Sequence, residues 1–160
     1  MTIQKVPIRI VIADDHAVFR TGLRSYLSNF PDCKVVGEAN NGDDLVEMVR
    51  SLAPDVVVTD IDMPRKTGIE AAADICKYNP SSRILILSVH ASQQHIINMV
   101  DAGALGYILK SSDAEDRTRV ACVKGRYPKP LDYIGACLSQ SSTGLYLHRL
   151  FELLVIDQSF

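Results

Sequence analysis

Short runs of β-branched and other apolar residues alternate with helical patterns along the first two thirds of the chain. The runs span residues 8–12, 34–37, 55–59, 83–88 and 106–109. Such alternation is typical of βαβ units, in which helices cover both faces of a parallel sheet. We therefore predict a doubly wound α/β fold with a five-stranded parallel sheet. Sheets of this kind bind ligands beyond the carboxyl ends of their strands.

Apolar residues at helical spacing predict four helices between the strands. Their stripes are Phe19, Leu23, Tyr26, Leu27 and Phe30; Leu45, Val49 and Leu52; Ile69, Ala72, Ala73 and Cys76; and Ile96, Ile97 and Val100. The turn segment Asn41-Gly42-Asp43 is expected to precede the second helix, Pro54 is expected to mark its end, and the fourth helix is expected to stop at Gly103, because such residues interrupt or end helices.

The helical pattern weakens beyond Lys110. Residues 113–124 are predicted to form the last covering helix, although two arginines interrupt its apolar positions. Residues 125–160 are predicted to be a linker and a C-terminal helical tail. The stripe in that tail is Leu147, Leu150, Phe151 and Leu154. We expect a first domain over 1–124, and a tail over 125–160 that is covered within the chain or in a homodimer, because an exposed apolar stripe would be sticky.

Composition excludes several classes of protein. The formal net charge is −2, so the chain has no broad positive field for holding nucleic acid. The cysteines Cys33, Cys76, Cys122 and Cys137 are far apart and form no zinc motif. No apolar run approaches the roughly 20 residues of a membrane span or the core of a signal peptide. We expect a cytoplasmic protein with reduced thiols.

Acidic residues follow two of the predicted strands. Asp14 and Asp15 come directly after the first strand, and Asp60 comes directly after the third. If these parallel strands are neighbours, the carboxylates meet at one edge of the sheet. Aspartates often cap helices there, but three clustered carboxylates repel one another unless a cation is present. Oxygen ligands of this kind are what Mg²⁺ prefers.

Four segments carry a resemblance to a known family. IRIVIADDHAVFRTGL, PDVVVTDIDMPRKTGIEA, RILILSVHA and GALGYILK resemble the receiver domains of response regulators, particularly the NarL/LuxR-type subfamily, over residues 6–112. The resemblance implies a flavodoxin-like sheet of strand order 2-1-3-4-5. It also implies a two-component phosphorelay protein that takes a phosphoryl group from a histidine kinase or phosphotransfer protein and switches conformation to control a partner.

The resemblance also assigns roles to the acidic residues. Asp60 is the phosphoacceptor, Asp15 is a direct Mg²⁺ ligand, and Asp14 acts through water. The backbone carbonyl of Asp62 is a further ligand. The expected product is an acyl phosphate on Asp60, so the protein is a signalling switch that phosphorylates and slowly dephosphorylates itself, not a turnover enzyme.

Three residues on later strands complete the implied site. Lys110 pairs with the phosphoryl oxygens, Ser88 donates its hydroxyl to them, and Tyr107 is the switch aromatic whose ring turns inward with the serine. His16 is interpreted as a residue at the helix start and not as a metal ligand. His90 and His95 are given no catalytic role.

The chain departs from the subfamily at its C-terminus. Acidic and basic residues balance over 111–160, with no basic recognition helix, so DNA binding by this chain is not expected. The tail is interpreted either as native to a single-domain regulator or as the product of truncation or a frame shift.

Two other functions compete with this one, and the sequence argues against both. Asp60-Ile61-Asp62 is similar to the nucleophile and acid pair of haloacid-dehalogenase-like Mg²⁺-dependent phosphatases, although that motif belongs after a first strand. A flavodoxin-like nucleotide-binding protein would need a glycine-rich loop after the first strand, which is absent here.

Overall fold

The core of the protein is one sheet, which the computed structural model describes together with its helices over residues 6–89, 93–110 and 120–122. Its strands follow the order β2-β1-β3-β4-β5-β6. They are β1 (Ile8–Ala13), β2 (Cys33–Ala39), β3 (Val56–Asp60), β4 (Arg83–Ser88), β5 (Gly106–Leu109) and β6 (Val120–Cys122). The first five are parallel, which confirms the predicted doubly wound sheet of order 2-1-3-4-5.

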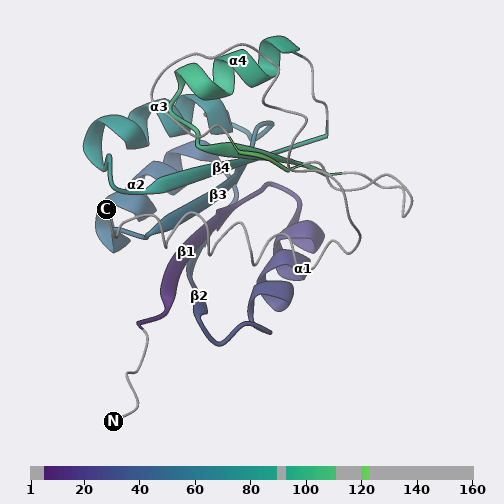
Figure 1. Cartoon of the computed structure of the whole chain (residues 1–160), viewed down its shortest axis with the longest axis vertical. Coiled ribbons are helices and arrows are strands. Elements are labelled where there is room, and N and C mark those ends of the chain that lie inside the picture. The colour runs from purple at the N-terminus through teal and green to yellow at the C-terminus, as the bar shows by residue number, and fades with distance from the viewer. Residues whose placement is uncertain (1–5, 90–92, 111–119, 123–160) are drawn as a thin grey trace.

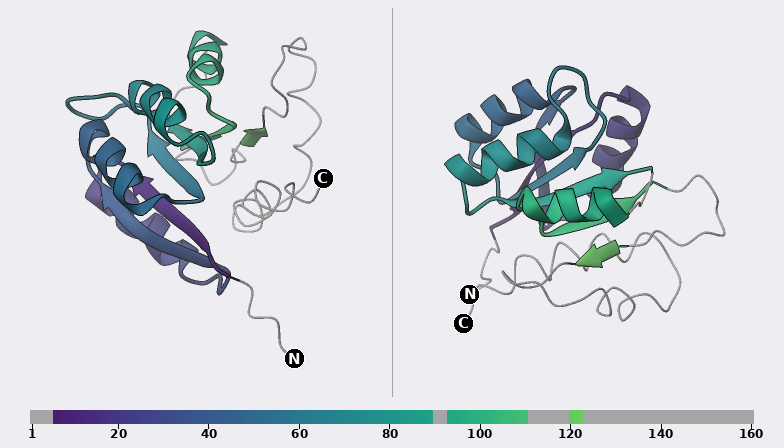
Figure 2. Two further views of the ribbon diagram at one scale, coloured as in Figure 1. Left: turned by 90° about the vertical axis from the view of Figure 1, so that its left-hand side faces the viewer. Right: turned by 90° about the horizontal axis from the view of Figure 1, so that it is seen from above.

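Helices cover both faces of the sheet (Figure 1 and Figure 2). They are α1 (Ala17–Leu27), α2 (Gly42–Leu52), α3 (Gly68–Tyr78) and α4 (Gln93–Asp101). Helix α1 lies on one face, and α2, α3 and α4 lie on the other. This is the covering that the alternating sequence pattern predicts for parallel strands.

The two faces of the sheet carry separate hydrophobic clusters. Successive residues of a strand point to opposite faces, so β1 contributes to both clusters. Ile10 and Ile12 pack with Leu23 and Leu27 of α1. On the other face, the cluster of α2 and α3 takes in the alternate residue Val11. Strands that are buried on both faces hold their carboxyl ends in a fixed position, which is where the acidic residues lie.

Polar caps begin two of the helices. The side chain of Asn41 accepts a hydrogen bond of 2.9 Å from the backbone N–H of Asp44, and α2 begins at Gly42, inside the segment that was predicted to precede it. Thr67 and Glu70 form a reciprocal capping box at the start of α3. These caps fix the helices that follow β2 and β3, and therefore the loops around the carboxyl edge of the sheet.

The buried faces of α3 and α4 differ from the predicted stripes. In α3 the fully buried side chains are Ala71, Ala72 and Ile75, while Ile69 and Cys76 are only partly buried. The predicted residues all contact the same core cluster, but the most deeply buried face is rotated toward Ala71 and Ile75, because α3 also packs against α2 and α4.

Helix α4 was predicted to bury Ile97 and Val100, and this was wrong. These side chains are 46% and 39% exposed, while Met99 is 2% exposed. Helix α4 packs on α3 and β5 through the side that carries Met99, and this docking decides which of several apolar residues is buried. Helix α1 also ends before Phe30, whose ring packs edge-on against Tyr26 from the following loop.

Residues 120–122 form strand β6, where a helix over 113–124 was predicted. Strand β6 pairs antiparallel with β5, and Tyr107 is opposite Ala121 in the register. Without a neighbour, β5 would present a row of unpaired N–H and C=O groups, and β6 satisfies them in place of a helix. Residues 111–119 and 123–160 lie outside the described part, and so does the predicted tail.

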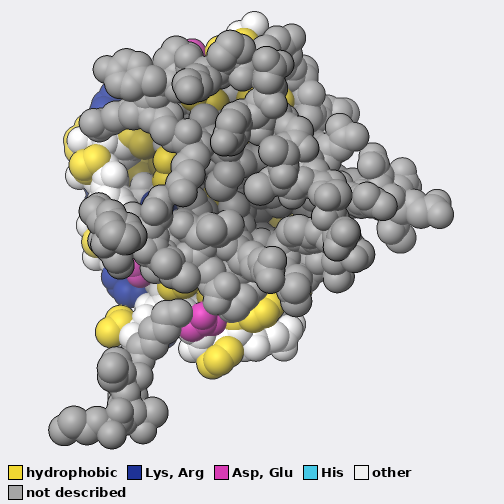
Figure 3. Space-filling view, in the orientation of Figure 1, with side chains coloured by type: hydrophobic (Ala, Val, Ile, Leu, Met, Phe, Trp, Pro, Cys, Tyr) yellow, Lys and Arg dark blue, Asp and Glu magenta, His cyan; other side chains and the backbone are white. Residues whose placement is uncertain are grey.

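None of the helices in the described ranges is long and apolar enough to cross a membrane. In the view of Figure 3, the described side chains show at the margins of the molecule, where hydrophobic, basic and acidic ones lie near one another. This mixture agrees with the near-neutral formal charge of the sequence.

Candidate functional site

Neighbouring strands bring the predicted acidic residues to one edge of the sheet. Strands β1 and β3 are paired in parallel, with Ala13 opposite Thr59. Asp14 is the next residue after β1, and Asp60 is the last residue of β3. The two side chains are 0% and 4% exposed. The structure therefore places two carboxylates together in a buried position, as the order of strands and aspartates predicted.

The Asp60 carboxylate is held on both of its oxygens. Oδ1 accepts a hydrogen bond of 2.9 Å from the backbone N–H of Ile61. Oδ2 lies 2.8 Å from Nζ of Lys110. Burial raises the pKa of Asp60, the charge of Asp14 raises it further, and the bond to Lys110 opposes the shift. A cation brought to this edge would relieve the cost of ionising Asp60.

Lys110 bridges the two buried carboxylates. Its backbone N–H donates to the carbonyl of Ser88 over 2.7 Å, which extends the pairing of β4 and β5 to the edge. Its ammonium donates to Oδ2 of Asp14 over 2.5 Å and pairs with Asp60. The same nitrogen lies over the Phe19 ring, 4.5 Å from the ring centroid, which is a cation–π distance. Lys110 thus faces the carboxylates, as predicted.

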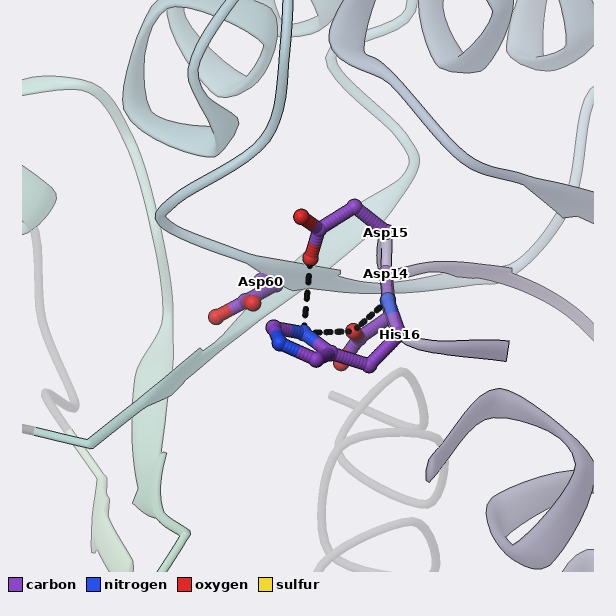
Figure 4. A group of neighbouring side chains, drawn as sticks. All are labelled: Asp14, Asp15, His16 and Asp60. Carbon is purple, nitrogen blue, oxygen red and sulfur yellow. Dashed lines mark hydrogen bonds and ion pairs between the residues drawn. The ribbon is translucent and has the colours of Figure 1, made fainter. Parts of the chain in front are cut away.

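Asp15 and His16 complete the cluster, which Figure 4 shows from close by. One donor atom from each of Asp14, Asp15, His16 and Asp60 lies within 4.8 Å of all the others. Asp15 is exposed, unlike the two buried aspartates. The cluster therefore has a closed side, formed by the ends of the strands, and an open side from which an ion or a phosphodonor can approach.

This donor set fits a hard divalent cation. Three of the four groups are carboxylates from two adjacent strand ends, and Mg²⁺ takes oxygen ligands while it keeps several waters. Two buried carboxylates share a single ammonium, so the buried part of the site carries an excess of negative charge. Asp14, Asp15 and Asp60 are the residues that would hold Mg²⁺.

The remaining predicted residues lie around this cluster. Ser88 is buried at the end of β4, one position beyond the residue paired with Asp60. Tyr107 is 6% exposed and belongs to the cluster under α2, α3 and α4. The side chain of Asp62 is exposed and is not among the grouped donors. The role of its carbonyl stays a prediction.

Sequence reasoning missed three contacts of this site. His16 was interpreted only as a residue at the helix start. It is the N-cap of α1, but its Nδ1 also faces the carboxylates. Phe19, taken as a core residue, lies over Lys110. The guanidinium of Arg20 donates to the backbone carbonyl of Asp14 over 2.6 Å. Phe19 and Arg20 lie in the first turn of α1, shortly after the acidic pair. This spacing was the sequence signal that could have placed them at the site.

Known proteins are similar to this chain in sequence. The family model for the response regulator receiver domain matches residues 10–120. The transcriptional regulatory protein DegU of Brevibacillus brevis is 36% identical over 126 residues, which are 77% of this chain and 53% of DegU. The nitrate/nitrite response regulator NarL of Escherichia coli K12 is 37% identical over 110 residues, which are 69% of this chain and 51% of NarL. The chain thus spans about half the length of these curated relatives.

Solved structures agree with this family. The signal receiver domain of a NarL response regulator from Mycobacterium tuberculosis has a TM-score of 0.65 and 34% identity, and the match covers 68% of this chain and 87% of that one. The response regulator domain of CheB from Thermotoga maritima has a TM-score of 0.65 and 28% identity over 92% of this chain and 93% of that one. These relatives are response regulators, so the phosphatase interpretation of Asp60 and Asp62 is not supported. The chain belongs to the response regulator receiver domain family.

Proposed function

We propose that Asp60 accepts a phosphoryl group in a Mg²⁺-dependent reaction. The observation that carries this proposal is the bridge of Lys110 between the buried carboxylates of Asp14 and Asp60, beside the exposed Asp15. Nucleophile, charge-balancing amine and oxygen ligands thus share one edge of the sheet. Bound Mg²⁺ would supply charge neutralisation between the carboxylate and the approaching phosphodonor.

The chemistry asks little of the protein beyond positioning. A carboxylate oxygen of Asp60 forms a bond to phosphorus, and the bond from phosphorus to the leaving group of the donor breaks, with its electron pair leaving on that group. Ile61 holds Oδ1 in place through its backbone N–H. Lys110 lies close enough to transfer its contact from the Asp60 carboxylate to the oxygens of the new acyl phosphate.

We infer that the donor is a histidine kinase or a histidine phosphotransfer protein in the cytoplasm, as in the phosphorelays of this family. After phosphorylation, the hydroxyl of Ser88 would turn to the phosphoryl oxygens and Tyr107 would respond within the cluster under α4. Both side chains are buried on neighbouring strands, with Tyr107 paired to Ile86 of β4. A movement of Ser88 therefore reaches Tyr107 through packed neighbours. The altered surface would control a partner protein, such as a second copy of the chain.

Incubation of the protein with acetyl phosphate and Mg²⁺ is expected to add one phosphoryl group per chain, measured as intact mass. Chelation of Mg²⁺ should slow this uptake about 100-fold or more, because a bound cation contributes several kcal/mol to such a step. The label should be lost in hydroxylamine, which cleaves acyl phosphates.

A folded protein that takes up no phosphoryl group under these conditions would refute the proposal. Release of phosphate from many molecules of a phosphate ester per chain would instead indicate a phosphatase. Circular dichroism of the same sample verifies that the chain is folded.

A further inference from the structure

The imidazole of His16 lies among the carboxylates of the acidic edge (Figure 4). Its Nδ1 is 2.7 Å from Oδ1 of Asp15 and 3.3 Å from Oδ1 of Asp14. The same nitrogen belongs to the group of donor atoms that includes Asp60. Carboxylates alone would serve a hard cation, so the presence of a nitrogen donor needs its own explanation.

These separations match those between donors that share one metal ion. Donor atoms about 2.1 Å from a common ion, at right angles to each other, lie about 3.0 Å apart. The distances from Nδ1 to its two carboxylate neighbours lie on either side of that value. Nδ1 would therefore need little movement to enter the first coordination sphere once its proton is on Nε2.

The main chain of His16 holds its imidazole near the site, and the ring makes no helix-capping bond that would keep it away. The backbone N–H of His16 donates to Oδ1 of Asp14 over 2.8 Å, so its main chain is anchored to the acidic edge. His16 stands at the N-cap of α1, yet its side chain makes no capping hydrogen bond. The side chain is 71% exposed, so its ring can adjust to an ion without disturbing the core.

We propose that His16 is a ligand of the divalent-cation site and that it raises the affinity of this site for transition ions relative to its affinity for Mg²⁺. Imidazole suits Ni²⁺ and Zn²⁺, whereas Mg²⁺ gains little from a nitrogen donor. This inference rests on the proposed cation site at Asp14, Asp15 and Asp60, and adds a nitrogen ligand to it.

The test compares Ni²⁺ and Mg²⁺ binding by calorimetry in the wild-type protein and in His16→Gln. We expect the ratio of the Ni²⁺ to the Mg²⁺ dissociation constant to rise about tenfold or more in His16→Gln, because an amide oxygen replaces the nitrogen. The matched control is His95→Gln, an exposed histidine on α4, which should leave the ratio unchanged. Pulsed electron paramagnetic resonance of bound Mn²⁺ should show ¹⁴N coupling in the wild-type protein and none in His16→Gln.

An unchanged ratio in His16→Gln would overturn the inference. Tighter binding of both ions by His16→Gln would also overturn it, since the ring would then be an obstacle in the site. Failure of the proposed function appears elsewhere, as absent phosphoryl uptake by the wild-type protein with Mg²⁺, so the two results are separable.

Discussion

Replacement of Asp60 by asparagine is expected to reduce phosphoryl uptake from acetyl phosphate to background. The amide has no carboxylate oxygen that can attack phosphorus. Among the grouped carboxylates, that of Asp60 is at the end of β3, and the N–H of the next residue holds one of its oxygens in place. Loss of a covalent nucleophile removes the reaction itself, so the effect is complete rather than partial. The measurement is the intact mass of wild-type protein and Asp60→Asn after the same incubation.

Asp62→Asn is the matched control for this prediction. It makes the same carboxylate-to-amide change at a neighbouring aspartate. The Asp62 side chain is exposed, however, and is not part of the group formed by Asp14, Asp15, His16 and Asp60. We expect Asp62→Asn to take up the label as the wild type does. Uptake by Asp60→Asn, or its loss in Asp62→Asn alone, would contradict the assignment of the nucleophile.

The fold of Asp60→Asn can be verified by unfolding in the absence of metal. Burial raises the pKa of Asp60 in the folded state, so the folded carboxyl ionises at a higher pH than the unfolded one, whose pKa is about 3.9. The wild type therefore loses stability as the pH rises from the unfolded pKa through the folded pKa, and the loss persists at neutral pH. Asp60→Asn should be at least as stable as the wild type at neutral pH, without this loss.

Replacement of Gly68 by alanine is expected to destabilise the protein by roughly 2–4 kcal/mol. An added methyl group at Gly68 would collide with the backbone carbonyl of Asp60 and press against the side chain of Thr59. The backbone N–H of Gly68 also donates to the carbonyl of Ile61 over 2.8 Å, so the loop cannot retreat without breaking this bond. Unfolding in urea, followed by circular dichroism, measures the change.

The control for Gly68→Ala is Gly22→Ala. Gly22 lies within α1, where an added methyl group meets no atom within 4 Å. Because alanine favours helix over glycine by about 1 kcal/mol, Gly22→Ala should stabilise the protein. Equal effects at the two glycines would show that the close approach of α3 to Asp60 is absent in solution.

The position of the site could be predicted because it depends on strand ends. Parallel strands place their carboxyl ends at one edge, so Asp14 after β1 and Asp60 at the end of β3 had to converge once β1 and β3 were neighbours. Lys110 follows the same logic at the end of β5, where its backbone bonds to Ser88. Short, continuous runs of β-branched and other apolar residues, separated by helical patterns, are typical of such strands, which are buried on both faces of the sheet.

Side-chain direction at the ends of elements could not be predicted. His16 is the N-cap of α1 and Phe19 lies in its first turn, yet the ring of His16 lies beside carboxylates and the ring of Phe19 lies over an ammonium. A sequence pattern gives the residue's place on the helix but not its rotamer. The resemblance to the family carried no role for either ring.

The pairing at the β5 edge of the sheet and the buried face of α4 also could not be predicted from the sequence. Helix α4 has more apolar residues than one face can bury, so docking on α3 and β5 chose Met99 over Ile97. Strand β6 spans three residues, too short a run to show a period. Its pairing with β5 is a tertiary contact that overrides the weak local helical pattern.

The most direct measurement is the location of the phosphoryl group along the chain. After incubation with acetyl phosphate and Mg²⁺, reduction by borohydride converts an aspartyl phosphate to homoserine, and peptide mass spectrometry then identifies the altered residue. We predict homoserine at position 60 and at no other aspartate of the cluster. Homoserine at Asp14, Asp15 or Asp62 instead, or a label on His16, would contradict the account.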